Sequence, residues 1–368
     1  MTKIKSFIKT NAVVLIAALA AIITSFIVPP DREYLDYFDF KTLTCLFCVL
    51  AVVCALRNIR FFYTLAKAIV RKFKNTRLAI LALVYITFIG SMLIANDMAL
   101  LTFLPLGYFV LHTTGKEKYM AFTYIMQNIA ANLGGMLTPF GNPQNLYLYT
   151  KFNIPDGEFI RIMFTPFIIS IAMITILCIV FVKPEKLEIS ERAASLPIPR
   201  VVIYLALFAL SILIVFRTIP FVVGLIVIPI ALLFLDRRAL LMVDYGLLLT
   251  FVFFFIFSGN MARIDAVRDF FSMLLEKNTL VFSALSCQVI SNVPSAILLS
   301  QFTENYRDLL LGVNIGGVGT LIASLASLIT FKEYTKDQPG HTFRYILKFS
   351  LFNFLFLAVL MVICLIIP

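Results

Sequence analysis

The chain has 368 residues, of which 61% are hydrophobic and only 14% carry a charge. A soluble domain is about 45–50% apolar and about 25% charged, so this composition excludes an ordinary soluble protein. The net charge of +11 indicates neither nucleic-acid binding nor an acidic substrate, because the cytoplasmic loops of membrane proteins are enriched in Lys and Arg. The sequence predicts an all-α protein that crosses a membrane several times.

The first apolar stretch, at 11–28, is predicted to be a membrane helix rather than a signal peptide. A spanning helix needs about 20 mostly apolar residues, and this stretch is longer than the apolar core of a signal peptide. It follows Lys3, Lys5 and Lys9, which place the N-terminus in the cytoplasm. The six cysteines also lie in apolar runs, and we interpret them as packing residues.

Loop charges predict a re-entrant hairpin in the first half. Seven Lys and Arg residues lie between positions 57 and 77, and another basic patch follows at 116–118. The apolar run 78–111 between these patches is interrupted at Ala95-Asn96-Asp97. Because basic loops stay in the cytoplasm, a run with basic patches at both ends has to return to its starting side. We therefore predict a hairpin at about 78–112 whose tip reaches toward the middle of the membrane.

The next segment, at about 119–150, is predicted to be a broken transmembrane helix. It contains G-G-M-L-T-P-F-G-N-P-Q-N at positions 134–145. Glycine and proline weaken or interrupt an α-helix, and an irregular backbone at membrane depth is tolerated only inside protein or beside an aqueous cavity. The break is therefore expected to expose backbone groups to a ligand site.

The second half repeats this plan in the opposite orientation. A second hairpin is predicted at about 279–302, with its break at Ser291–Ser295, and a second broken helix at about 309–330. The heptapeptide N-I-G-G-V-G-T at 314–320 resembles N-L-G-G-M-L-T at 132–138. The second hairpin would open to the outside, so the two halves are predicted to be inverted-topology repeats. On this topology most of the 31 Lys and Arg residues lie in the cytoplasm.

The predicted organisation has five parts. In chain order they are an N-terminal helix and outer loop (1–41), the first repeat (42–182), a cytoplasmic linker (183–200), the second repeat (201–342) and a C-terminal transmembrane helix (343–368).

Four stretches carry a resemblance to a known family. They are A-N-D-M-A-L-L, L-T-P-F-G-N-P-Q-N, S-N-V-P-S-A-I-L-L and V-N-I-G-G-V-G-T-L-I-A-S-L-A-S-L-I. The chain resembles, over essentially its whole length, the anion-permease branch of the ion transporter superfamily, which includes divalent anion–sodium symporters, citrate transporters and arsenite permeases. It is most similar to a short bacterial inner-membrane subgroup. The resemblance implies an elevator mechanism and a homodimer.

The hairpin tips depart from the pattern of the sodium-coupled dicarboxylate members. Those members carry Ser-Asn-Thr at both tips, whereas this chain has Ala95-Asn96-Asp97 and Ser291-Asn292-Val293. Both threonines are missing, which weakens the case for a dicarboxylate. In arsenite permeases an Asn-Asp-Gly sequence stands where Asn96-Asp97 does here, so arsenite efflux is an alternative.

The predicted site lies at the midplane, where broken helices of inverted repeats meet. Half-helix N-termini there attract anions, and unwound carbonyls coordinate sodium. The predicted substrate- and ion-binding residues are Asn96, Asp97, Asn132, Gly134, Gly135, Thr138, Gly141, Asn142, Asn145, Ser291, Asn292, Pro294, Ser295, Asn314, Gly316, Gly317, Thr320 and Ser324. Sodium is predicted at Asn96, Gly135, Asn292 and Gly317.

Several of these residues have a structural alternative. A carboxylate at membrane depth costs about 2.5–3.5 kcal/mol on insertion scales, so Asp97 is interpreted as a sodium ligand or a proton-coupling group, or else as a cap of the hairpin tip. Thr138 and Thr320 would otherwise bond only to backbone carbonyls. Asn142 and Asn145 would otherwise cap the second half-helix.

The sequence predicts a secondary active transporter of a small carboxylate or inorganic oxyanion in the bacterial inner membrane, coupled to sodium or protons. No Lys or Arg falls in the predicted site, which also permits arsenite efflux or sodium–proton antiport through Asp97. The chain has no H-E-x-x-H, no G-x-S-x-G and no nucleotide-binding loop, so no enzyme activity is predicted. The expected partners are the substrate, membrane lipid and a second copy of the chain, with no nucleic acid and no cofactor besides a coupling sodium ion.

Overall fold

The computed structural model describes residues 12–187 and 196–366. Within these ranges every regular element is a helix, apart from one isolated β-bridge between Asn75 and Lys186. Six of the described helices are long and apolar enough to cross a membrane, which confirms an all-α polytopic architecture. The lysine-rich N-terminal lead, Arg192 of the linker and the last two residues lie outside the described ranges.

The helices of the first half run from the N-terminus to the loop before residue 188. They are α2 (Ala12–Ile27), η1 (Arg32–Tyr37), α3 (Phe40–Asn58), α4 (Phe61–Val70), α5 (Thr76–Ile94), α6 (Asn96–Thr113), η2 (Glu117–Tyr119), α7 (Met120–Gly134), η3 (Gly135–Leu137), α8 (Pro143–Lys151) and α9 (Asp156–Phe181). The helices of the second half are α10 (Ile198–Val215), α11 (Phe221–Leu235), α12 (Arg237–Leu241), α13 (Tyr245–Ala262), α14 (Asp265–Ile290), α15 (Asn292–Leu299), α16 (Tyr306–Ile315), α17 (Leu325–Asp337) and α18 (Thr342–Ile366).

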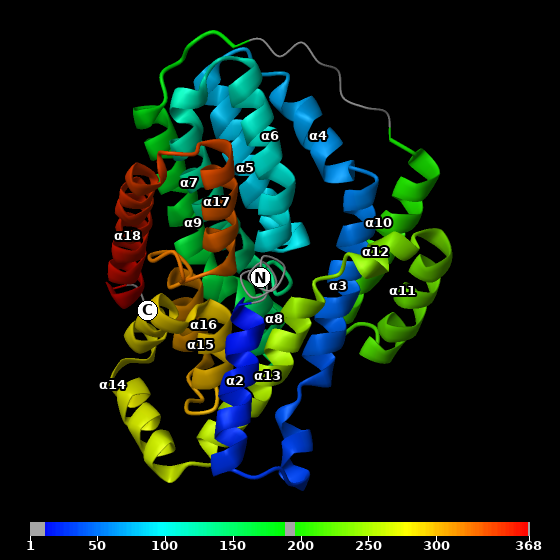
Figure 1. The fold of residues 1–368 in the computed structure, drawn as a ribbon, viewed down its shortest axis with the longest axis vertical. Helices are drawn as coiled ribbons and strands as arrows, with labels where there is room; N and C mark the ends of the chain where they lie inside the picture. The colour runs from blue at the N-terminus through cyan, green and yellow to red at the C-terminus, as the bar shows by residue number, and fades with distance from the viewer. Residues whose placement is uncertain (1–11, 188–195, 367–368) are drawn as a thin grey trace, which may run out of the picture.

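Two helical hairpins lie in opposite halves of the molecule. Helices α5 and α6 meet at Ala95 and lie in the upper half of Figure 1, together with α7 and α17. Helices α14 and α15 meet at Ser291 and lie in the lower half, together with α8 and α16. Helix α14 also has non-helical backbone at Asn278, whose side-chain oxygen accepts a hydrogen bond from the Val281 amide at 2.9 Å. The second hairpin arm therefore has its own start just after Asn278.

Two helices are interrupted near the middle of the molecule. Helix α7 ends at Gly134 and the chain resumes as α8 at Pro143, a residue that favours the first turn of a helix. A Cβ atom on Gly134 would lie 2.2 Å from the carbonyl oxygen of Phe88, so only glycine permits α7 to pack this closely on α5. Helix α16 ends at Ile315 and the chain resumes as α17 at Leu325.

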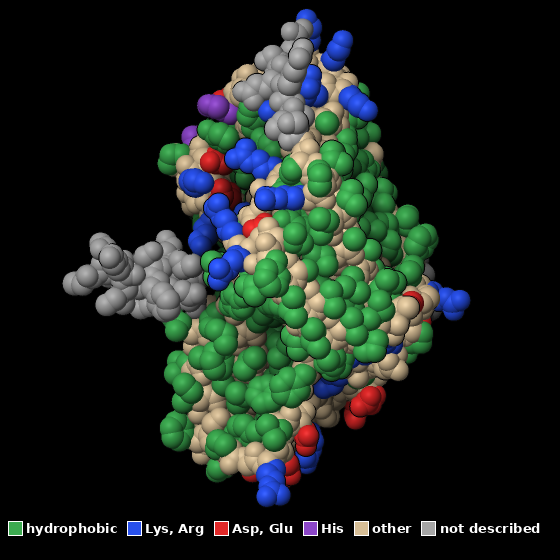
Figure 2. Space-filling view, turned by 90° about the vertical axis from the view of Figure 1, so that its right-hand side faces the viewer, with side chains coloured by type: hydrophobic (Ala, Val, Ile, Leu, Met, Phe, Trp, Pro, Cys, Tyr) green, Lys and Arg blue, Asp and Glu red, His purple; other side chains and the backbone are tan. Residues whose placement is uncertain are grey.

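The outer surface of the helix bundle is apolar. Side chains on α10, α11 and α18 remain largely exposed, such as Val202 (61%), Phe234 (83%) and Leu351 (67%). Figure 2 shows a broad hydrophobic band, with Lys and Arg gathered above it and mixed charges at the lower end. An exposed apolar band of this extent suits lipid rather than water.

The loop after α9 is bound to the base of the first hairpin. The carbonyl oxygen of Glu185 accepts hydrogen bonds from the amide and the hydroxyl of Thr76, at 2.9 and 3.0 Å. The Leu187 amide donates to the carbonyl oxygen of Lys74 at 3.0 Å. These bonds continue the β-bridge between Asn75 and Lys186 and hold the loop against the start of α5.

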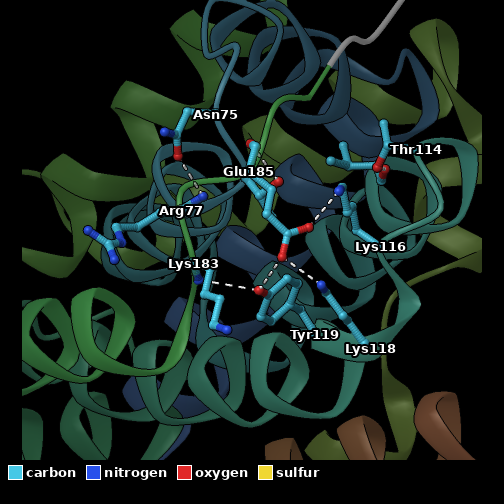
Figure 3. A network of polar contacts seen from close by, with 10 residues as sticks. Asn75, Arg77, Thr114, Lys116, Lys118, Tyr119, Lys183 and Glu185 are labelled. Carbon is cyan, nitrogen blue, oxygen red and sulfur yellow. Dashed lines mark hydrogen bonds and ion pairs between the residues drawn. The ribbon is translucent and has the colours of Figure 1, made fainter.

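The side chain of Glu185 adds a charged network to this loop (Figure 3). Its carboxylate accepts hydrogen bonds from Lys116 and Lys118, both at 2.6 Å, and from the Tyr119 hydroxyl at 2.9 Å. The hydrogen bond from Lys116 is the main cause that lowers the pKa of Glu185 to about 2, with Lys118 and Tyr119 adding to it. The network joins the loop to the end of α6 and the start of α7.

We predict that Glu185→Gln lowers the midpoint temperature of thermal unfolding at neutral pH. Because the folded pKa lies below the usual 4.5, the carboxylate stabilises the fold above about pH 4.5, and this contribution is lost as the pH falls through about 2. The difference between wild type and variant should therefore narrow as the pH drops below 4.5. Asp269→Asn, at an exposed position on α14, is the control. A difference that does not change with pH would contradict this role.

Candidate functional site

The tip of the first hairpin is hydrogen-bonded to the break between α7 and α8. Ala95 has φ +64°, a conformation that strains a non-glycine residue, and α6 begins immediately after it. The Asn96 amide donates to the carbonyl oxygen of Gly141 at 3.1 Å, and its side-chain Oδ1 accepts from the Asp97 amide at 2.9 Å. The side-chain Nδ2 of Asn96 donates to Oδ1 of Asn132 at 3.3 Å.

The tip of the second hairpin makes the same contacts with the break between α16 and α17. Ser291 has φ +74°. The Asn292 amide donates to the carbonyl oxygen of Ala323 at 2.9 Å, and its Oδ1 accepts from the Val293 amide at 2.9 Å. When the two similar heptapeptides are aligned, Ala323 stands where Gly141 stands in the first half. Both tip asparagines therefore bind corresponding carbonyls.

The two threonines of the heptapeptides bind the hairpin arms. The Thr138 hydroxyl donates to the carbonyl oxygen of Met92 at 2.7 Å, and the Thr320 hydroxyl donates to that of Gln288 at 3.1 Å. Met92 and Gln288 each lie three residues before the positive-φ residue of their tip. The two hydroxyl protons are thus used within the protein, and these threonines position the breaks against the hairpins.

Amide side chains join the two breaks to each other. Nδ2 of Asn142 donates to Oδ1 of Asn314 at 3.2 Å and to the carbonyl oxygen of Asn132 at 3.1 Å. Nδ2 of Asn314 donates to Oδ1 of Asn145 at 2.6 Å. Asn145 in turn donates to the carbonyl oxygens of Gly135, at 3.3 Å, and of its neighbours in the first break. All four asparagines are buried, and we call them the amide cluster.

Gln288 was not among the predicted site residues, although it organises the second break. Its Nε2 donates to the carbonyl oxygens of Gly316, at 2.9 Å, and Val318, at 3.2 Å, while its Oε1 accepts from the Thr320 amide at 2.8 Å. A Cβ atom on Gly319, whose φ is +127°, would lie 2.2 Å from this Oε1. An amide inside an apolar hairpin arm, four residues before Asn292, was the available signal.

Other polar residues of the region were also missed. Nε2 of Gln144 lies 3.4 Å from Oδ1 of Asn314. Asn128 on α7 donates to Ser327 on α17 at 3.3 Å and accepts from Thr330 at 3.4 Å. These contacts join the two halves within the upper part of the molecule. Buried polar side chains in apolar helices were the signal in each case.

The remaining predicted residues separate into two groups. Gly317 lies where the halves meet, because a Cβ atom there would be 3.1 Å from Nδ2 of Asn292 and 3.7 Å from Oδ1 of Asn132. The others have structural contacts. Gly134 packs on α5, and Gly316 packs on Ala284 of α14. The Ser295 hydroxyl is hydrogen-bonded to that of Ser286, Ser324 caps α17, and Pro294 is buried within α15.

At the first hairpin tip and the start of α8, three buried side-chain oxygens have no hydrogen-bond partner among the described residues. They belong to Asp97, Asn142 and Gln144. A buried polar atom without a partner costs free energy, so each is suited to a ligand, an ion or water. Asp97 lies in the first turn of α6 and makes no capping hydrogen bond with its side chain.

Comparison with known proteins agrees with this architecture. A model of the citrate transporter family matches residues 1–305. The chain is 33% identical over 302 residues to an uncharacterized transporter of Methanocaldococcus jannaschii, covering 82% of each chain. It is 30% identical over 325 residues to the inner membrane protein YbiR of Escherichia coli K12, covering 85% of each chain.

These matches confirm the resemblance to the anion-permease branch that the motifs indicated. They also confirm that the protein is a multi-pass membrane transporter and not an enzyme. The chain belongs to the citrate transporter family.

Proposed function

We propose that the protein is a secondary transporter of a small carboxylate or inorganic oxyanion, driven by a sodium or proton gradient. The observation that carries this proposal is the convergence of two hairpin tips and two helix breaks on one buried amide cluster. Such a site holds an anion through N–H groups and amides rather than through Lys or Arg. The family to which the chain belongs supports an anion as substrate.

The corresponding contacts in the two halves support an inverted-repeat organisation with the boundaries 42–182 and 201–342. Asn96 and Asn292 bind corresponding carbonyls, and Thr138 and Thr320 bind corresponding arm residues. These contacts tie each hairpin to its broken helix. The two hairpins (α5, α6, α14 and α15) and the two broken helices (α7, α8, α16 and α17) would therefore move together. We propose that this unit slides against α3 and α10–α13 as an elevator, in a homodimer.

The substrate would bind between the two tips, beside Gly317. Helices α6 and α15 begin at the tips, so the positive ends of their helix dipoles lie beside this position. Backbone carbonyls of the breaks are available for sodium, and we place the coupling ion near Asn96 and Gly135 in one half and near Asn292 and Gly317 in the other. This arrangement accounts for anion binding without a fixed cation.

A second candidate function is sodium–proton antiport centred on Asp97. The observation that favours it is the buried Oδ1 of Asp97, which has no hydrogen-bond partner within residues 12–187 and 196–366. A carboxylate at membrane depth is expensive and commonly marks an ion or proton pathway. In the anion symport mechanism the same carboxylate would bind the coupling ion.

We predict that Asn292→Ala abolishes anion uptake into proteoliposomes and leaves the protein folded. The substitution removes the side-chain oxygen that orders the start of α15 and the amide next to Gly317. Gln338→Ala, at the end of α17 and without a side-chain hydrogen bond in the described chain, should transport normally. Folding is checked by size-exclusion chromatography and the unfolding midpoint. Normal uptake by a folded Asn292→Ala protein would remove this tip from the site.

The proposed topology predicts opposite accessibility at the bases of the two hairpins. Lys118→Cys, whose parent side chain is 58% exposed, should react with an impermeant thiol reagent only from the cytoplasmic side. Glu304→Cys, at an exposed position between α15 and α16, should react only from the outside. The wild-type protein is the control, because its cysteines are buried or half-buried. Labelling of both positions from one side would contradict oppositely directed hairpins.

A further inference from the structure

A second polar site lies outside the amide cluster, in a cavity. One side of the cavity is formed by α6, and the other by the end of α3 and the start of α4. The cavity has a volume of about 440 Å³ and is lined on one side by Arg57 and Arg60. Further along α4, the Lys67 ammonium lies 4.4 Å from the centre of the Phe109 ring on α6. Since α4 contacts α6 there, the cavity lies between this contact and the tip of the first hairpin.

The two arginines line the cavity from two adjoining helices. Arg57 lies in the last turn of α3, and Arg60 stands at the start of α4 with φ +56°, a strained conformation for an arginine. Neither guanidinium has an ion pair or a side-chain hydrogen bond among residues 12–187 and 196–366. A guanidinium has five N–H donors in a planar fork that matches carboxylate and oxyanion groups.

The opposite wall of the cavity leads toward the proposed site. It is formed by Leu101, Thr102 and Pro105 of α6. Pro105 has no N–H, so it cannot donate to the carbonyl oxygen of Leu101 four residues earlier, and this wall therefore offers a polar group to water. Asp97 lies one helical turn before Leu101 and on the same face of α6. The wall thus continues along the helix to the hairpin tip.

We propose that this cavity is a cytoplasmic vestibule, in which Arg57 and Arg60 bind the small carboxylate or oxyanion before it enters the amide cluster. The inference rests on the proposed function, and it adds the missing electrostatic element to it. The amide cluster contains no Lys or Arg, so long-range attraction of an anion has to come from elsewhere. Paired positive charges lining a recess raise the local anion concentration and the association rate, by about 10-fold or more at low ionic strength.

The test compares wild type with Arg57→Gln/Arg60→Gln in inside-out membrane vesicles, which present the cytoplasmic face to the medium. Citrate, succinate, sulfate and phosphate are supplied in turn, at low and high ionic strength. For the anion that wild type transports, the double variant should show a half-saturating concentration about 10-fold higher at low salt. Its maximal rate should be unchanged, and the salt dependence of the wild type should disappear.

The control is Lys332→Gln/Arg344→Gln, which removes two exposed positive charges of α17 and α18 that do not line the cavity. It should keep the half-saturating concentration and salt dependence of wild type. If the double variant in the cavity fails to fold, the single variants Arg57→Gln and Arg60→Gln replace it. Each should raise the half-saturating concentration by less than the double variant does.

The outcomes separate this inference from the proposed function. If wild type transports an anion and the variant has the same half-saturating concentration and salt dependence, the vestibule is overturned and the proposed function stands. If the variant instead loses bound phosphatidylglycerol in native mass spectrometry with unchanged transport, the cavity is a lipid headgroup site and the vestibule is again overturned. If wild type transports none of the four anions, the proposed function fails and the vestibule fails with it.

Discussion

The fold depends on satisfying the backbone groups of two broken helices at membrane depth. Hydrocarbon offers no hydrogen bonds, so non-helical backbone there has to be paired inside the protein. Asn145 binds carbonyls of the first break and Gln288 binds those of the second, while the hairpin tips add the amide bonds of Asn96 and Asn292. These bonds allow the chain to keep irregular backbone near the middle of the molecule, where we propose that the anion passes.

The same bonds have a mechanical consequence. Each break is attached to its hairpin through three kinds of contact: a tip amide, a threonine hydroxyl and a side-chain amide. Since Asn142, Asn145 and Asn314 also join the breaks to each other, a hairpin cannot shift far without its broken helix. In the proposed mechanism this rigidity favours movement of the whole unit over the opening of one hairpin. Solvent would then reach the site from the surface that faces α3 and α4.

Part of this arrangement could be predicted from the sequence. The polar residues inside apolar runs located the hairpin tips at Asn96 and Asn292. The repeated glycine-rich heptapeptide located both breaks, because glycine and proline interrupt a membrane helix. The sequence left two roles open for Thr138 and Thr320, ligand binding or a bond to a backbone carbonyl, since the two kinds of hydroxyl look alike in sequence; the structure shows the second. Gln288 was missed because its partners lie about 30 residues away and are backbone atoms.

The vestibule was hidden for a related reason. The basic segment after the second apolar stretch is typical of a loop under the positive-inside rule, and every Lys and Arg in it contributes equally to that pattern. Only the packing of α4 against α6 distinguishes Arg57 and Arg60, which line a cavity, from their neighbours. The substrate itself is likewise a property of the three-dimensional site and not of the fold.

We propose that the amide cluster binds a small anion together with a coupling ion. The most direct measurement is thermal unfolding of the purified protein with and without sodium, at two pH values, against citrate, succinate, sulfate, phosphate and arsenite. A ligand that binds only the folded state stabilises it by about 2.7 kcal/mol at a hundredfold excess over its dissociation constant. We expect one of these anions to stabilise the protein in a way that depends on sodium or on pH. A response to sodium or pH alone, with no effect of any anion, would contradict it and favour cation–proton antiport through Asp97.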